Sequence, residues 1–209
     1  MCIPFHPVNP VNNKTLKISG MKVRLFVAVE IPEEIRKKLG EFQDELKKAN
    51  ADVGWVAPEN LHITLKFIGS LDEEKIDEVV RIIKDSAAGT KLFDLNYMGV
   101  GAFPTEKNPR IVYADVIDSD GILTKIHEKL NNQLVALGVK HEDRKFEAHL
   151  TVGRIKTRKN VKRLMEILNS YNGFHFGLAQ VTRIVLMKSD LLQKGPIYTK
   201  LHTIDLVSL

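Results

Sequence analysis

The sequence contains almost no cysteine, since Cys2 is the only one among 209 residues. A single thiol cannot form an internal disulfide framework, and it cannot by itself build a cysteine metal site. Secreted scaffolds held together by disulfides and cysteine-based zinc folds are therefore excluded. A protein of this composition is expected in a reducing, cytoplasmic setting.

Long apolar runs are missing as well. No stretch approaches the roughly 18 to 20 apolar residues that span a bilayer. The first residues also lack the charged region and the continuous apolar region of a secretory signal. We expect neither a membrane segment nor secretion. Residues 1–20 are rich in proline and asparagine without periodicity, and we expect them to be an extension outside the fold.

Motifs for nucleotide-driven chemistry are absent too. The sequence has no Walker-type glycine-rich loop and no Gly-x-Gly-x-x-Gly after a predicted strand. His127, His141 and His175 show no paired metal-ligand spacing. The sequence therefore predicts neither a nucleotide cofactor nor a metal.

Positive charge is in excess, with a net charge of +5 and a pI near 9.2. Such a charge attracts anions, phosphates in particular, and favours an anionic partner. Many of the lysines stand in Lys-Lys and Glu-Lys pairs, which usually form solvated helix faces. For any single lysine, the solvated face is therefore the alternative to a role in binding.

Hydrophobic periodicity predicts a mixture of strands and helices, and thus the α+β or mixed α/β class. Strands are expected at 24–31, 91–103, 110–117, 146–155, 174–188 and 196–206. Helices are expected from Pro32, from Asp72 to just before Gly89, from Asp120 to Gly138, and after Thr157.

The chain also resembles itself. Arg24-Leu-Phe-Val-Ala-Val-Glu-Ile is similar to Arg110-Ile-Val-Tyr-Ala-Asp-Val-Ile at an offset of about 86 residues, and His62-Ile-Thr-Leu is similar to His149-Leu-Thr-Val at about 87. This duplication predicts one bilobal domain over 21–209, with repeats at roughly 21–107 and 108–209. Each lobe is expected to be a mainly antiparallel sheet with helices on its outer face, and the active-site cleft is expected between the lobes. Strands can be exchanged between such lobes, so the repeats do not define the spatial boundary.

The two histidine segments have the period-two pattern of half-buried strands. From Leu61 to Phe67 the odd positions are apolar, so His62, Thr64 and Lys66 are expected to share the polar face. In the second segment His149 and Thr151 share that face. Arg154 has the opposite parity and reaches it only if Gly153 bends the strand or forms a bulge.

Two histidines on facing strands suit the hydrolysis of a phosphodiester. One removes a proton from the attacking water, and the other delivers a proton to the leaving oxygen on the opposite side of phosphorus. Each neighbouring threonine hydroxyl can donate to a non-bridging phosphate oxygen. Lys66 and Arg154 are further candidates for contacts with the phosphate. The alternative is that both histidines are merely solvent-facing strand residues.

These residues carry a family resemblance. The tetrads His62-Ile-Thr-Leu and His149-Leu-Thr-Val resemble the signature of the 2H phosphoesterase superfamily. Together with Arg24–Pro32, the segments His62–Gly69 and His149–Arg154 are similar to its RNA 2',3'-cyclic phosphodiesterase branch, historically called 2'-5' RNA ligase. The similarity covers residues 21–209.

The resemblance implies a bilobal enzyme that hydrolyses 2',3'-cyclic phosphate ends of RNA to 2'-phosphomonoesters, without metal or ATP. It also implies a capacity to join RNA ends through a 2'-5' bond. We expect a monomer. His62 would donate the proton to the leaving 3'-oxygen, and His149 would accept a proton from water. Because the repeats are approximately symmetric, the reverse division of roles is the alternative.

Aromatic residues near the ends of predicted strands are candidates for reading the RNA base. Phe103 and Tyr198 could stack on a terminal base, with core packing as the alternative for each. Trp55, just before the first tetrad, is expected to be a hydrophobic plug. Two rival functions use the same features: a 2H phosphoesterase acting on small nucleotides, and a binding module for RNA ends without catalysis.

Overall fold

The computed structural model describes residues 20–193 and 195–207, so that nearly all of the expected extension at 1–20 lies outside the described residues. The strands are β1 (Lys22–Glu30), β2 (Val53–Trp55), β3 (His62–Asp72), β4 (Phe93–Phe103), β5 (Ile111–Ile117), β6 (His149–Ile155), β7 (His175–Val181), β8 (Arg183–Leu192) and β9 (Gly195–Asp205). The helices are α1 (Glu33–Lys47), α2 (Ile76–Ala87), α3 (Ile122–Gln133) and α4 (Val161–Asn169). None of the helices in this part of the chain is long and apolar enough to cross a membrane.

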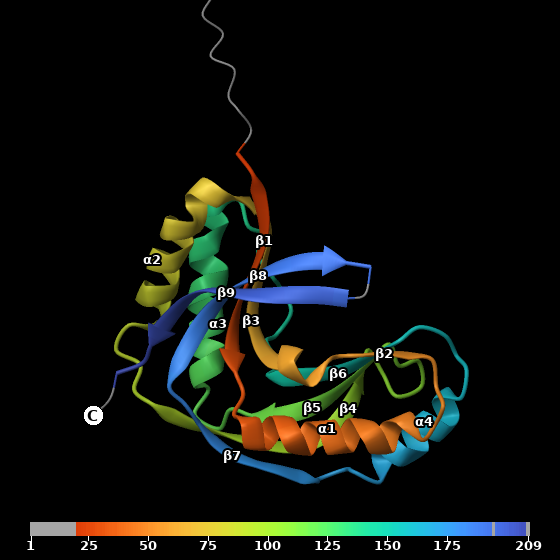
Figure 1. Cartoon of the computed structure of the whole chain (residues 1–209). Coiled ribbons are helices and arrows are strands. Elements are labelled where there is room, and N and C mark those ends of the chain that lie inside the picture. Colours follow the sequence, from red (N-terminus) through yellow and green to blue (C-terminus); the bar gives the residue numbers. More distant parts are fainter. Residues whose placement is uncertain (1–19, 194, 208–209) are drawn as a thin grey trace, which may run out of the picture.

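The strands form one sheet in the order β7-β4-β5-β6-β3-β1-β8-β9, with β2 paired to β6. All pairs between these strands are antiparallel. The sheet has two halves, which we call the β1 half (β3, β1, β8, β9) and the β5 half (β7, β4, β5, β6). They are joined through β3 and β6, whose one pair is Ile63 with Leu150. The predicted α+β fold with antiparallel sheets is confirmed (Figure 1).

Elements are exchanged between the two sequence repeats. The strand β4 belongs to the first repeat but pairs with β5 and β7, whereas β8 and β9 belong to the second repeat and extend the sheet from β1. Helix α1 follows β1 yet lies against α4 and β7, and α3 follows β5 yet lies against α2 and β3 (Figure 1). The spatial halves are therefore built from both repeats.

The run 174–188, predicted as one strand, is in fact two. The chain leaves β7 at Val181 and enters β8 at Arg183, so it crosses from an edge of the β5 half to the β1 half. Neither glycine nor proline stands at the break, and both segments contain buried residues of the strand type. Local patterning therefore gave no signal for the crossing.

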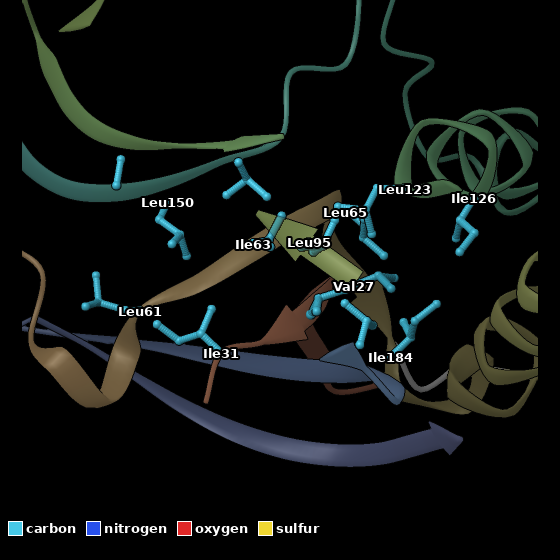
Figure 2. Close-up of a cluster of buried hydrophobic side chains, with 14 of the residues drawn as sticks. Val27, Ile31, Leu61, Ile63, Leu65, Leu95, Leu123, Ile126, Leu150 and Ile184 are labelled. Carbon is cyan, nitrogen blue, oxygen red and sulfur yellow. The ribbon is translucent and has the colours of Figure 1, made fainter. Parts of the chain in front are cut away.

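The core lies behind the strands that carry the histidines. Leu61, Ile63 and Leu65 on the β3 side are buried beside Leu150 of β6, and helix α3 adds Leu123. Figure 2 shows these side chains in one apolar cluster. Because side chains alternate along a strand, this burial leaves the intervening histidine and threonine positions on the opposite face. We call that opposite face of β3 and β6 the site face.

Each tetrad ends in a β-bulge. Thr64 pairs with Ala28 and Lys66 with Val27, so Leu65 is the extra residue of β3. In β6, Thr151 and Gly153 pair with consecutive residues of β5, which makes Val152 the extra residue. The bulges occupy equivalent positions in the two repeats. A bulge reverses the alternation, so the residues that follow point to the face opposite to the one that simple parity predicts.

Strand pairing also corrects the alignment of the repeats. Thr64 pairs with Ala28, and the equivalent Thr151 pairs with Tyr113. The first strands of the repeats therefore correspond at an offset of 85 residues, because 113 minus 28 is 85, and not at 86. Tyr113 thereby takes the place that Ala28 has in the β1 half, which puts a large aromatic ring beside the second tetrad.

Candidate active site

The structure brings His62, Thr64, His149 and Thr151 together on the site face. All four are partly buried, while Ile63 and Leu150 between them are fully buried. The antiparallel register of the Ile63–Leu150 pair sets each histidine beside the threonine of the other tetrad. The two histidines then lie on a diagonal, which spans about 7–8 Å in regular antiparallel pairs. One phosphate group can be reached from both sides at this spacing.

Both imidazoles are held in the same way by the main chain. Nδ1 of His62 lies 2.7 Å from the carbonyl oxygen of Asn60, and Nδ1 of His149 lies 2.7 Å from that of Glu147. A carbonyl only accepts, so Nδ1 carries the hydrogen and donates it in each ring. Nε2 is left to exchange a proton with a substrate. The neutral ring accepts there, and the charged ring donates.

Two aromatic rings pack against the ring of His62. The centroid of its ring is 4.8 Å from that of Phe26 and 5.3 Å from that of Tyr198, which meets it edge-on. Burial lowers the pKa of His62, and the hydrogen bond to the Asn60 carbonyl opposes this only in part. The ring is therefore held towards its neutral form when no anion is bound.

His149 has a different pair of aromatic neighbours. The ring of Phe103 lies 5.2 Å from it and that of Tyr113 lies 5.6 Å from it, and the two aromatic rings stack on each other at 4.3 Å. Gly101 makes room for this stack, because a Cβ there would overlap the Tyr113 ring. Both predicted base-stacking residues, Phe103 and Tyr198, thus contact the tetrad histidines.

The charges around the two rings differ. Burial raises the pKa of Tyr113, and the carboxylates of Asp115, Glu147 and Glu106 raise it further. Burial also raises the pKa of Tyr198, but there the guanidinium groups of Arg154 and Arg24 oppose the rise. Carboxylates thus lie around Tyr113 beside His149, and guanidinium groups lie near Tyr198 beside His62.

From the sequence, Arg154 was expected to reach the site face only if the strand bends or bulges just before it, and the structure has such a bulge. The bulge at Val152 restores it to the site face, where it is exposed and lies near enough to Tyr198 to affect its ionisation. Arg24, Phe26 and Tyr113 were not identified as site residues from the sequence. These residues lie on β1 and β5, the strands that pair with the tetrad strands. Only the register of that pairing shows that they lie near the tetrads.

Lys66 does not lie on the site face, and this prediction was wrong. The bulge at Leu65 turns its side chain towards α3, where it is fully buried. Its Nζ donates to Oδ1 of Asn131 at 2.8 Å and to the carbonyl of Lys140 at 3.0 Å, and lies 3.2 Å from a carboxylate oxygen of Glu142. The ammonium group therefore links β3 to the loop before β6, through Lys140 and Glu142. Phe67 takes the outward position instead and is 55% exposed.

Replacing Lys66 by methionine should therefore affect stability rather than phosphate binding. The change removes the side-chain donor to the part-buried carbonyl of Lys140 and one of the two donors to Oδ1 of Asn131, which still accepts from the N–H of Glu142. We expect the free energy of unfolding to fall by about 1–3 kcal/mol. Urea unfolding measures this loss, while titration with a nucleoside 2'-monophosphate should give a Kd close to that of the unaltered chain. Unchanged stability together with strongly weakened binding would contradict this prediction and would indicate that Lys66 binds the phosphate.

Among residues 20–193 and 195–207, no three His, Cys, Asp or Glu side chains gather in the way that a metal ion requires. The chemistry that the site face can offer from its own residues is two Nε2 atoms for proton transfer, two hydroxyl donors, and a nearby guanidinium group. That set suits an anionic phosphate ester.

Comparison with known proteins agrees with this geometry. A family model described as LigT like Phosphoesterase matches residues 29–113 and again 117–198, so that each repeat carries one match. The RNA 2',3'-cyclic phosphodiesterase of Archaeoglobus fulgidus is 39% identical over 183 residues, which cover 88% of this chain and all of that protein. The enzyme of the same name from Methanothermobacter thermautotrophicus is 35% identical over 186 residues, 89% of this chain and all of the relative.

Solved structures share the fold. A Thermus thermophilus protein superposes with a TM-score of 0.72 at 28% identity, covering 88% of this chain and 97% of that one. Apo LigT of E. coli gives the same TM-score at 23% identity, covering 88% and 98%. The resemblance to the 2H phosphoesterases is confirmed by the match of both repeats and by the identity to these relatives. The chain belongs to the LigT-like phosphoesterase family.

Proposed function

We propose that this chain hydrolyses 2',3'-cyclic phosphate ends of RNA to 2'-phosphomonoesters. The observation that carries the proposal is the pair of equivalent His-Thr sets on one face, each imidazole with its Nδ1 bound to a main-chain carbonyl and its Nε2 free. Relatives at 35% and 39% identity are named RNA 2',3'-cyclic phosphodiesterase. The net charge of +5 suits an RNA substrate.

The proposed reaction is a single in-line displacement. His149 takes a proton from water, the water oxygen bonds to phosphorus, the bond from phosphorus to the 3'-oxygen breaks, and His62 protonates that oxygen. The products are a 2'-phosphate and a 3'-hydroxyl. Thr64 and Thr151 would donate to the non-bridging oxygens, and Arg154 would offset the charge that develops on them.

The pKa of His62 predicts a particular pH dependence. An acid must be protonated, so activity falls as pH rises through its pKa. Because burial lowers the pKa of His62, the limb of kcat/KM that His62 governs should lie below the ordinary histidine value of about 6.5. A bound phosphate anion raises the pKa of His62, so the descending limb of kcat should lie at higher pH than that of kcat/KM.

Profiles of kcat and kcat/KM, combined with an NMR titration of the His62 ring, check this dependence. A pKa of His62 at or above the ordinary histidine value of about 6.5 in the free chain would contradict this expectation. Burial favours the neutral form of His62 in the empty site, so the bound phosphate anion is needed to favour its protonated form.

The activity itself is tested with an RNA oligonucleotide that ends in a 2',3'-cyclic phosphate, in the presence of EDTA. We expect turnover to a 2'-phosphate, identified by its ³¹P signal. No turnover, or a 3'-phosphate product, would contradict the proposal, and loss of activity on adding EDTA would indicate a metal. Competition by a mononucleoside cyclic phosphate across salt concentrations separates RNA from a small-nucleotide substrate, because several phosphate contacts give a steep salt dependence.

We also propose that the same step joins RNA ends when a 5'-hydroxyl takes the place of water. The attacking oxygen then bonds to phosphorus and the 3'-oxygen leaves as before, which produces a 2'-5' bond. A monomeric state and a cytoplasmic setting are further predictions from the sequence.

A further inference from the structure

The carbonyl groups at the two bulges are both bound by buried side chains. Nε2 of Gln43 donates to the carbonyl of Val152, the extra residue of β6, at 2.8 Å. Nδ1 of His127 donates to the carbonyl of Leu65, the extra residue of β3, at 2.7 Å. Gln43 is 1% exposed and His127 is 4% exposed. Neither residue takes part in the proposed chemistry.

The two contacts are equivalent and run crosswise between the repeats. Gln43 lies on α1, which follows the first strand of the first repeat, yet it reaches the bulge of the second tetrad. His127 lies on α3, which follows the first strand of the second repeat, yet it reaches the bulge of the first tetrad. Two different residue types thus make the same contact at symmetry-related places, so we treat the contact as a built feature of the fold.

Each side chain has a second partner that extends the contact. Nε2 of Gln43 also donates to the carbonyl of Val56, 2.8 Å away, just after β2. The ring of His127 stacks on Phe146 at 4.7 Å and 19°. Phe146 lies three residues before His149, so His127 contacts the segments that carry both tetrads.

Holding a bulge determines which side chains face the substrate. A bulged residue loses part of its regular ladder pairing, and a buried carbonyl without a donor is unfavourable. The carbonyl of Val152 also accepts from the N–H of Val56 at 3.0 Å, so Gln43 is its second donor. A donor placed at that carbonyl therefore favours the bulged register over a regular one. If the strand were paired without its extra residue, the alternation would no longer be reversed at the bulge. Either the His-Thr pair or the residues that follow that pair would then point to the other face. In the bulged register the histidines face the site, and Phe67 and Arg154 follow them there.

We infer that Gln43 and His127 are positioning residues, each of which holds the tetrad of the opposite repeat in register and so aims its histidine at the phosphate. His127 aims His62, and Gln43 aims His149. The kinetic side of this inference rests on the proposed function, whereas its structural side does not.

Variants can remove the donor while keeping the packing. In His127→Phe the ring that stacks on Phe146 remains and the donor is lost; in His127→Gln the donor remains and the ring is lost. Gln43→Met keeps the length of the side chain without a donor. We expect His127→Phe and Gln43→Met to lower kcat by about 10- to 100-fold with KM within about threefold, because a displaced reacting group costs rate. His127→Gln should restore kcat to within about threefold of the unaltered chain, because a glutamine makes the same contact at position 43.

A second readout does not depend on turnover. In NMR spectra of the histidine rings, assigned with the alanine variants, His127→Phe should shift the signals of His62 more than those of His149, and Gln43→Met should do the reverse. A merely structural role would lower stability without this crosswise pattern. Ser86→Ala is the control, since Ser86 is a fully buried polar residue on α2 whose hydroxyl makes no hydrogen bond within 20–193 and 195–207. It should leave kcat and both rings unchanged.

Unchanged kcat and unshifted rings in His127→Phe or in Gln43→Met would overturn the inference, and so would equal shifts of both rings in each variant. If one of these variants does not fold, the other decides by the same two readouts. If the unaltered chain does not hydrolyse the cyclic phosphate, the proposed function fails, and the ring shifts alone still decide this inference.

Discussion

Replacing either His62 or His149 by alanine is expected to lower kcat for RNA 2',3'-cyclic phosphate by about 10²- to 10⁴-fold, because proton transfer by a placed imidazole contributes a factor of this size. Both rings are held at Nδ1 by a main-chain carbonyl at 2.7 Å, so each presents only Nε2 to the substrate. Single-turnover assays with EDTA present measure the loss. Full activity in either variant would refute two-histidine chemistry.

The double variant and a control complete this test. Groups that act as a unit are not additive, so the double variant should be little slower than the slower single variant. His175→Ala, which changes an exposed histidine at the start of β7, should retain full activity. A 3'-deoxynucleoside 2'-(4-nitrophenyl phosphate) distinguishes the acid from the base, because its leaving group, 4-nitrophenolate, departs without being protonated. The variant that lacks the acid should lose much less rate on this ester than on the cyclic phosphate.

Replacing Thr64 or Thr151 by valine is expected to lower kcat by about 10²- to 10³-fold, which is the usual effect of removing one donor to a developing oxyanion. Each threonine lies on the site face beside the histidine of the other tetrad. Valine keeps the shape and the strand preference of threonine, so the fold should persist. The rate is measured with the same cyclic-phosphate RNA, together with far-ultraviolet circular dichroism to check folding.

The matched variants for the threonines are Thr64→Ser and Thr151→Ser, which keep the hydroxyl and should retain most of the rate. Thr199→Val removes an exposed hydroxyl from β9 and should have no effect. If Thr64→Val and Thr151→Val kept the full rate, the hydroxyls would have no part in stabilising the transition state, and Arg154 with the main chain would have to supply that stabilisation.

The sequence predicted the tetrad residues because their placement depends on a local property. Strand alternation acts over a few residues, and it puts His62, Thr64, His149 and Thr151 on one face, as in the structure. The repeat offset only relates the two segments to each other. The same reasoning failed for Lys66, only two residues beyond Thr64. The bulge at Leu65 depends on the partner strand β1 and on a donor from α3, and neither is visible in the local pattern.

The remaining site residues come from long-range pairing. Phe26 and Tyr113 reach the histidines because β1 and β5 flank the tetrad strands, and Tyr198 reaches His62 from β9, more than 130 residues along the chain. From the sequence, Tyr198 was only a candidate for base stacking, because it is an aromatic residue near the end of a predicted strand. The register between a tetrad strand and its partner strand determines which residues of the partner lie beside the tetrad. This register is set by the bulges and by packing between the repeats.

The central claim is that one phosphate lies between two histidines from the two repeats. Titrating the chain with a nucleoside 2'-monophosphate, while the ring signals of His62 and His149 are followed by NMR, tests it most directly. The account predicts that both rings shift together, with one Kd and a stoichiometry of one ligand per chain. A response of only one ring, or two rings with different Kd values, would contradict it.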